Sequence, residues 1–359
     1  MMNDSDRPQS MANPPRFAST IWTLLFLSPF IAELLSGSTR TSILFVFIPE
    51  LMVWGVGALL GRELVRRWRA GGTSLLFLAL ALSIAEEFLI QQTSLAPLPF
   101  PGSYPDYGRR GGINLVYLLF MLGYESVWTV VVPVQITELF FPRQAGQPWL
   151  RLRGIILACV AFLIGCRIAW YGWTQQARPR LHAPPYPPPL GMIALGLVAI
   201  ATLVVAAYLV RGFGLPSPND ERPTVPAWLG GLTAFVMGAA WFELIGQNFI
   251  PRPVQPFWIA LAAGATWALA AFTLFVRWSS RPAWGATHRF AAAFGATLAC
   301  MAAPYLTIAS WPKIDVVGKI IFDVLALTGF LLLARNVYSG ARKIPTQVVR
   351  DRASAMTGQ

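Results

Sequence analysis

The chain has little charge for its length. Charged residues make up 12% of its 359 residues, whereas hydrophobic residues make up 55%. A soluble globular protein carries about a quarter charged residues, and intrinsically disordered chains have low hydrophobicity. The composition therefore excludes both classes for most of the chain and leaves a polytopic membrane protein, with the lipid bilayer as its first partner.

Histidine and the usual metal or enzyme motifs are also scarce. The two histidines are His182 and His288, and neither is placed deep in an apolar run. The three cysteines lie inside apolar runs and have neither zinc-type nor disulfide-type spacing. The patterns GxxxxGK[ST] and HExxH are absent. The sequence thus predicts no metal site, and it identifies neither a cofactor nor a catalytic residue.

Lysine is rare, so the formal net charge of +12 comes almost entirely from arginine. A soluble protein this basic would suggest a nucleic-acid partner. Here the arginines form short patches between apolar runs, which is typical of membrane topology signals. We therefore expect no nucleic-acid partner.

Apolar runs near the length of about 20 residues that a transmembrane helix needs occur ten times. They cover residues 20–37, 41–61, 74–92, 112–141, 152–173, 190–210, 226–245, 257–276, 290–310 and 316–333. The predicted fold is an all-α polytopic transmembrane bundle of about ten spans. It occupies residues 20–336, between short cytoplasmic tails at 1–19 and 337–359.

The distribution of positive residues predicts the orientation. With the N-terminus in the cytoplasm, 19 lysines and arginines lie on the inner side, 8 lie on the outer side, and Arg167 lies within a span. Short cytoplasmic loops carry an excess of positive residues. Both termini are therefore expected in the cytoplasm, which requires an even number of spans.

The informative residues are acids inside the predicted spans. An ionisable group in a span is costly and by default marks a functional site or a buried pair. Most of these acids are predicted to lie between the midplane and the outer face, and Arg167 is the one deep cation. The candidate polar site consists of Glu33, Glu50, Glu86, Glu87, Gln91, Glu125, Arg167, Glu243 and Gln247.

Helical spacing groups some of these residues into polar stripes. Ser83, Glu87 and Gln91 follow one another at intervals of four and share one helix face. Two adjacent carboxylates in a low dielectric disfavour joint ionisation, so one of Glu86 and Glu87 should hold a proton near neutral pH. In the last span, Asp315, Lys319 and Asp323 alternate in sign at the same interval and can pair within their own helix.

Three interpretations of the acids remain open. They can form a satisfied structural network in which Arg167 neutralises one or two glutamates. They can line a pathway for a cation or for protons. They can also form a catalytic pocket that opens to the outer face.

The stretch AEEF at residues 85–88 resembles the first motif of the CPBP intramembrane protease family, which is similar to the eukaryotic CAAX-prenyl endopeptidases. In that family an arginine follows four residues after the second glutamate, where this chain has Gln91. The family also uses histidines in two later helices, and neither His182 nor His288 matches them. The resemblance is confined to one helix, and it implies an intramembrane enzyme.

A broader resemblance covers the first three spans. The stretch PFIAELLSGST at residues 29–39, with Pro49, Glu50 and the pair Glu86-Glu87, is similar to a group of uncharacterised bacterial polytopic membrane proteins. This resemblance implies a multi-pass protein of the bacterial cytoplasmic membrane and no particular activity.

The leading functional hypothesis is therefore a transporter or binder of a small cationic or proton-coupled solute. The alternatives are an intramembrane enzyme acting on a lipid or lipid-linked substrate, and a structural partner of a membrane complex. The sequence does not choose among them, and it predicts no oligomeric state.

Overall fold

The computed structural model describes residues 17–100, 103–104, 106–183, 185–216, 222–249 and 255–356, and only the backbone of residues 340–356. In this part of the chain ten helices are long and apolar enough to cross a membrane. They are Ala18–Leu35, Thr41–Arg67, Gly72–Ile90, Leu115–Phe140, Leu152–Arg180, Leu190–Leu209, Ala227–Phe249, Phe257–Ser279, Ala286–Leu306 and Lys313–Ser339. The predicted all-α fold with ten helices that could span a membrane is confirmed, while the cytoplasmic location of the termini stays a prediction.

The spans are assembled from α-helices and shorter helical segments. The α-helices are α1 (Ala18–Pro29), α2 (Phe47–Glu50), α3 (Val56–Arg67), α4 (Gly72–Ala85), α5 (Leu115–Tyr124), α6 (Val132–Phe140), α7 (Leu152–Trp170), α8 (Arg178–Arg180), α9 (Leu190–Leu209), α10 (Ala227–Gly246), α11 (Phe257–Ser279), α12 (Ala286–Ala302) and α13 (Lys313–Met356). Short 3-10 segments are η3 (Thr41–Val46), η8 (Gln247–Phe249), η9 (Ala303–Leu306) and η10 (Ile308–Ser310).

Each of the first five spans also contains a π-helical segment, a wider turn in which backbone N–H groups bond to carbonyls five residues earlier. These segments are η2 (Phe30–Leu35), η4 (Leu51–Gly55), η5 (Glu86–Ile90), η6 (Glu125–Val131) and η7 (Tyr171–Ala177). π-helical turns are rare and occur frequently at functional sites. Their concentration in the first five spans favours a functional site in this half of the chain.

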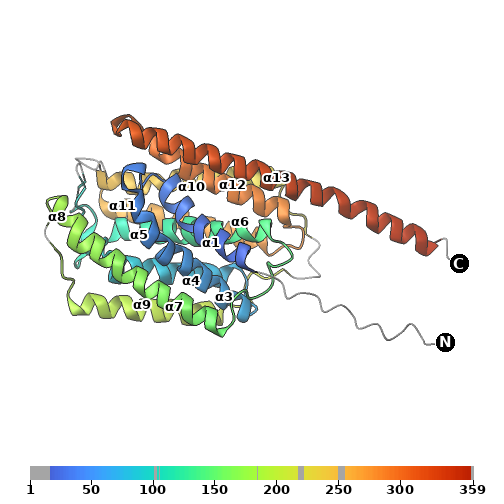
Figure 1. Ribbon diagram of the computed structural model, residues 1–359, viewed down its shortest axis with the longest axis horizontal. Helices are drawn as coiled ribbons and strands as arrows, with labels where there is room; N and C mark the ends of the chain where they lie inside the picture. The colour runs from blue at the N-terminus through green and yellow to red at the C-terminus, as the bar shows by residue number, and fades with distance from the viewer. Residues whose placement is uncertain are drawn as a thin grey trace.

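The helices run side by side along the long axis, with α13 at one edge and α9 at the opposite edge (Figure 1). The third span is the most deeply packed, since 67% of its apolar window is buried, compared with 6% for the fifth span. The fourth span is 56% buried and the sixth and eighth are 11% buried. The third and fourth spans therefore lie in the protein interior, whereas the fifth, sixth and eighth present most of their surface to the bilayer.

The two ends of the bundle carry different features. One end, here called the hairpin end, has a two-stranded hairpin of β1 (Arg109–Arg110) and β2 (Ile113–Asn114). The opposite end, here called the arginine end, carries Arg62 and Arg66 at the close of α3. Under the predicted orientation the hairpin end faces outward and the arginine end faces the cytoplasm.

Close packing of α10 against α12 forms the centre of the second half of the bundle, and a contact from η6 joins this pair to the first half. Gly295 lies against the backbone of Gly231 with no room for a side-chain carbon, so glycine is needed at this crossing. The indole of Trp128 donates a 2.7 Å hydrogen bond to the carbonyl of Ala296. Such tryptophan bonds satisfy carbonyls inside the bundle and fix η6 against α12.

Several helices extend beyond the apolar runs that the sequence predicts. The second span continues to Arg67, the fifth continues to Arg180, and α13 continues as helix to Met356, into the predicted tail. Hydropathy detects only the part of a helix that lies in hydrocarbon, whereas the backbone hydrogen bonds continue into the polar flanks. The predicted N-terminal tail, residues 1–19, lies almost wholly outside the described residues.

A buried glutamate cluster as the candidate functional site

Five of the predicted site residues lie in or directly before the π-helical segments of four spans. Glu33 is in η2, Glu86 and Glu87 open η5, Glu125 opens η6, and Glu50 is the residue before η4. A π-turn rotates the following side chains relative to a regular helix, because it accommodates one extra residue. The local backbone therefore decides where these carboxyls point. We call these five residues the glutamate cluster.

The structure brings the members of the glutamate cluster together. The charges of Glu33 and Glu50 interact, Glu86 interacts with Glu87, Glu33 and Glu50, and Glu125 interacts with Glu86 and Glu87. Four of the five are buried, and only Glu33 is partly exposed. Carboxyls from four separate spans thus share one interior region near the hairpin end.

Short hydroxyl side chains supply most hydrogen bonds to the cluster. Thr93 donates to both carboxyl oxygens of Glu87, at 2.8 and 2.9 Å, and Ser94 donates to the same carboxyl at 2.5 Å. Ser83 donates to Glu125. Neutral donors of this kind leave the net charge of the site unchanged, so they orient the carboxyls without neutralising them.

Two further donors complete the polar surroundings. Thr39 donates to Glu50, and the indole of Trp54 donates to Glu33. Thr39 lies between the first and second spans, directly before the helix that carries Glu50. The link between the first two spans therefore contributes to the site.

Several polar atoms of the cluster have no hydrogen-bond partner among the described residues. They are both carboxyl oxygens of Glu86, Oε2 of Glu50 and Oε1 of Glu125. The hydroxyls of Ser126 and Thr129, on the same segment as Glu125, are buried and unpartnered as well. Buried polar groups in proteins are normally hydrogen-bonded. A concentration of unpartnered atoms therefore indicates hydrogen-bonding capacity that bound protons, water or a polar solute would satisfy.

The placement predicted for Arg167 is wrong. Arg167 is exposed, and its guanidinium lies over the rings of Trp170 and Tyr171, at 4.6 and 5.6 Å from their centroids. The fifth span is peripheral, so an arginine on its outer side contacts aromatic neighbours instead of the bundle interior. Among the described residues, no lysine or arginine forms an ion pair with a member of the glutamate cluster.

The remaining predicted site residues lie at the margin of the cluster or apart from it. Gln91 is partly exposed and lies beside Glu86. Glu243 is exposed on α10, and no contact of its carboxyl with the cluster is found among the described residues. Gln247 is partly buried at the end of the same span, where its side-chain oxygen has no partner.

The polar stripe predicted along the third span does not persist as a single face. Ser83 bonds to Glu125, and Glu87 interacts with that same carboxyl while it accepts from Thr93 and Ser94. Gln91 instead lies beside Glu86, because the π-turn that begins at Glu86 changes the register after this point. Spacing alone could not reveal this change.

Apart from Ser83, the candidate site did not include the hydroxyl and aromatic side chains that surround the acids, such as Thr93, Ser94 and Trp54. Tyr117 is buried, lies near the charges of Glu87 and Glu125, and hydrogen-bonds with Thr93. The signal available in the sequence was the pair Thr93-Ser94 directly after the third span, where polar residues return to cover the acids.

A second buried charge network, also missed, lies at the arginine end. The carboxyl of Glu138 accepts from Arg62 at 3.0 Å and from Arg66 at 2.6 Å. Glu63 accepts from the backbone N–H groups of Trp149 and Leu150, at 2.6 and 3.2 Å. We call Arg62, Glu63, Arg66 and Glu138 the arginine-end network. The spacing of Arg62 and Arg66 by four was a signal for a shared carboxylate partner.

The charges of the last span pair only in part as predicted. Lys319 and Asp323 form an ion pair within α13, and Tyr305 donates to Asp323 at 2.8 Å. Asp315 instead accepts from the backbone N–H and the hydroxyl of Ser42, at 2.8 and 3.0 Å. Outside the spans, burial lowers the pKa of Arg40, and the charge of Asp315 opposes that shift.

The histidines lie away from the glutamate cluster. His182 is exposed after α8, and His288 contacts the carbonyl of Val225 at 3.0 Å near the arginine end. Among the described residues, no group of three or more His, Cys, Asp or Glu side chains has a geometry that could hold a metal ion.

Comparison of the chain with protein-family models, with curated proteins and with solved structures finds no match.

Proposed function

We propose that this integral membrane protein binds and moves a small solute together with protons, and that the glutamate cluster carries those protons. The observation that supports this proposal is the meeting of five carboxyls from four spans without a cationic partner among the described residues. Several buried carboxylates in a low dielectric cannot all be ionised at once. The cluster must therefore hold protons or bind a cationic solute.

The unpartnered oxygens of Glu86 give the cluster a centre for exchange. Glu86 interacts with Glu33, Glu50 and Glu87, while Thr93 and Ser94 hold only Glu87. A carboxyl whose one neighbouring donor is the partly exposed Gln91 can gain or lose a proton, or accept a polar group of a solute, with little loss of hydrogen bonding. Glu86 is thus the proposed site of proton exchange, and Glu87 is the neighbouring carboxyl that Thr93 and Ser94 hold in place.

The π-turns support movement as well as binding. Each of the four spans that carry the cluster has a π-turn at or beside its glutamate. Such turns have poorer backbone geometry than a regular helix and often mark functional positions. A local change between π and α register would rotate a carboxyl toward or away from its neighbours.

A pH jump on reconstituted protein tests the proposal. Proteoliposomes are adsorbed on a solid-supported membrane, and the charge displaced by a rapid change of external pH is recorded. We expect wild-type protein to displace charge, and Glu86→Gln and Glu87→Gln to remove most of that signal, because an amide cannot take up a proton.

Glu243→Gln is the matched control, since Glu243 is a membrane-embedded glutamate that is exposed and outside the cluster. Its signal should equal that of the wild type. A wild-type signal no larger than that of protein-free liposomes would overturn the proposal. So would a full signal from the Glu86→Gln and Glu87→Gln variants at equal reconstituted amounts.

A further inference from the structure

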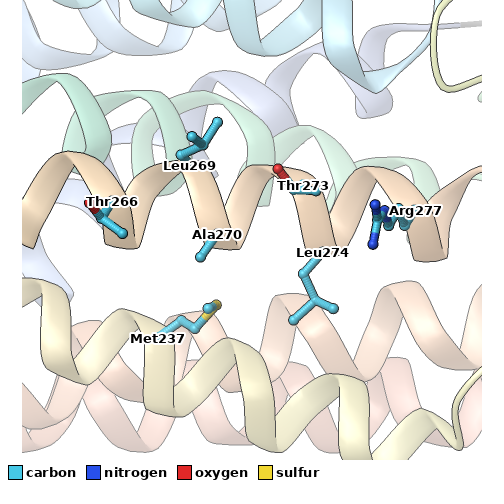
Figure 2. Close-up of a pocket in the computed structure, with 7 residues that line it drawn as sticks. All are labelled: Met237, Thr266, Leu269, Ala270, Thr273, Leu274 and Arg277. Atoms are coloured by element: carbon cyan, nitrogen blue, oxygen red, sulfur yellow. The ribbon is translucent and has the colours of Figure 1, made fainter.

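A groove of about 460 Å³ runs along the bilayer-facing side of the bundle between α10 and α11. Its lining is Met237, Thr266, Leu269, Ala270, Thr273, Leu274 and Arg277. Figure 2 shows the α11 residues in a row from Thr266 at one end to Arg277 at the other, with Met237 reaching across from α10. All but Met237 fall at helical intervals of three and four, so they form a single stripe on α11.

The groove is as long as one leaflet of a bilayer. Thr266 lies near the middle of the span Phe257–Ser279, and Arg277 lies in its last turn. At a rise of 1.5 Å per residue, the distance from Thr266 to Arg277 along the helix is about 17 Å. Half of a hydrocarbon core about 30 Å thick is about 15 Å. The groove thus reaches from the bilayer midplane to the headgroup level at the arginine end.

The composition of the groove changes along its length. Ala270 and Leu274 give its middle an apolar surface, and the small side chain of Ala270 leaves the space that the groove occupies. Arg277 is exposed at the end, and no ion pair to it is found among the described residues. An apolar channel that ends in a free cation matches an acyl chain attached to an anionic headgroup.

Aromatic side chains mark the same end as the membrane interface. Trp278 stacks on Trp284 at a centroid distance of 5.9 Å, and Phe275 packs edge-on against Trp278 at 5.5 Å. Tryptophans concentrate at the level of the lipid headgroups. This cluster places Arg277 beside the phosphate layer, independently of the helix length.

We propose that the groove binds one acyl chain of an anionic phospholipid, with the lipid phosphate held by Arg277. The chain lies on Ala270 and Leu274 and ends near Thr266. The guanidinium binds phosphate oxygens through charge-assisted hydrogen bonds, which a zwitterionic headgroup satisfies less well because its own cation competes. The ligand class is therefore a lipid with net negative charge in the leaflet at the arginine end.

Native mass spectrometry of the full chain tests the site. Protein is reconstituted in vesicles of equal parts phosphatidylglycerol and phosphatidylcholine, extracted mildly, and analysed for retained lipid. We expect wild-type protein to retain phosphatidylglycerol in preference to phosphatidylcholine. Arg277→Gln should weaken retention of phosphatidylglycerol about tenfold, because it removes a charge-assisted bond to phosphate.

Two further variants separate this site from general lipid adhesion. Arg211→Gln removes another exposed arginine of the arginine end that is outside the groove, and it should leave retention unchanged. Ala270→Trp fills the groove and should displace the retained lipid while Arg277 is still present. Equal retention by wild type and Arg277→Gln would overturn the proposal. A dimer in wild type that Ala270→Trp abolishes would also overturn it, because a second copy would then occupy the groove.

Discussion

The second and fourth spans carry buried carboxyls near both of their ends, and the carboxyls at the two ends have very different hydrogen-bond partners. At the arginine end, Glu138 is paired with Arg62 and Arg66, and Glu63 is bound by backbone N–H groups. At the hairpin end, the glutamate cluster has neutral hydroxyl donors and no cationic partner among the described residues. Glu86 has not even a hydroxyl partner.

This difference predicts a structural role for the arginine-end network and a role in proton exchange for the glutamate cluster. The arginine-end network ties α3, α6 and the loop after α6 together, since Arg62 also donates to the carbonyls of Ala145 and Gln147, at 2.7 and 3.0 Å. Removing one partner of such a network leaves an uncompensated buried charge. Removing a carboxyl that has no partner leaves nothing behind. Stability should therefore depend on one group of acids and activity on the other.

The orientation of the bundle has the largest expected effect, because a reversed bundle would place the glutamate cluster on the cytoplasmic side and the arginine-end network on the outer side. Reporter fusions after Gly111, at the hairpin, and after Gln359 are expected to report opposite sides, with the Gln359 fusion in the cytoplasm, because 19 positive residues lie on that side and 8 on the other. Phosphatase activity from the Gln359 fusion in a bacterial host would contradict the predicted orientation.

Removal of the carboxyl shared by two arginines should give the largest change in stability. Glu138→Met keeps approximate side-chain size but leaves Arg66 without its carboxylate partner and leaves Arg62 with only the longer contact to Glu63, at 3.5 Å. We expect a loss of about 3–5 kcal/mol in the free energy of unfolding. Thermal unfolding in detergent measures it, with Glu243→Met as the control. A Glu138→Met protein as stable as wild type would contradict the structural role of the arginine-end network.

A smaller loss is expected from Glu63→Gln. The amide oxygen can still accept from the backbone of Trp149, but the charge that strengthens the bonds to Trp149 and Leu150 is lost. The expected cost is about 1–2 kcal/mol. Limited proteolysis at the loop between α6 and α7 should become faster, and unchanged cleavage together with an unchanged melting temperature would count against this role.

The smallest effect on stability is expected inside the glutamate cluster. Glu86→Met replaces a buried carboxyl, whose one neighbouring donor is the partly exposed Gln91, with an apolar side chain of similar size, so the free energy of unfolding should change by less than about 1 kcal/mol or increase. The same variant should lose the charge displaced by a pH jump. A marked destabilisation would show that Glu86 has a structural partner. The glutamate cluster would then not differ from the arginine-end network in its contribution to stability.

Much of the fold was predictable because a membrane span has a strong one-dimensional signal. All ten apolar runs correspond to helices, and even the weakest, which contains Glu33, is one of them. Most of the membrane acids were also identified from sequence alone, since an ionisable residue in an apolar run is conspicuous; Glu138, inside the predicted fourth span, was not among them. Which of them meet was not determined by that signal.

The sequence did not predict which face of each span points toward the interior of the bundle. Arg167 and Glu243 are as conspicuous in the sequence as Glu125, yet both are exposed, because packing among ten helices decides which face is interior. The pairing of Glu138 could not be seen in the sequence because its partners Arg66 and Arg62 are 72 and 76 residues away. The π-turns were unpredictable for a different reason, since π and α hydrogen bonding differ by one residue of register and little in composition.

The π-turns also have a consequence for how the sequence tolerates deletion. A π-turn contains one residue more than the α-helical turn it replaces, so deleting a single residue within η5 (Glu86–Ile90) can restore a continuous α-helix. The deletion would replace the π-type hydrogen bonds of this turn with α-type bonds and leave the end of the third span close to its present orientation, because the wider turn absorbs the extra residue. The chain therefore carries a set of short turns in which the loss of one residue changes the direction of the acids in the turn and leaves the rest of the span in place.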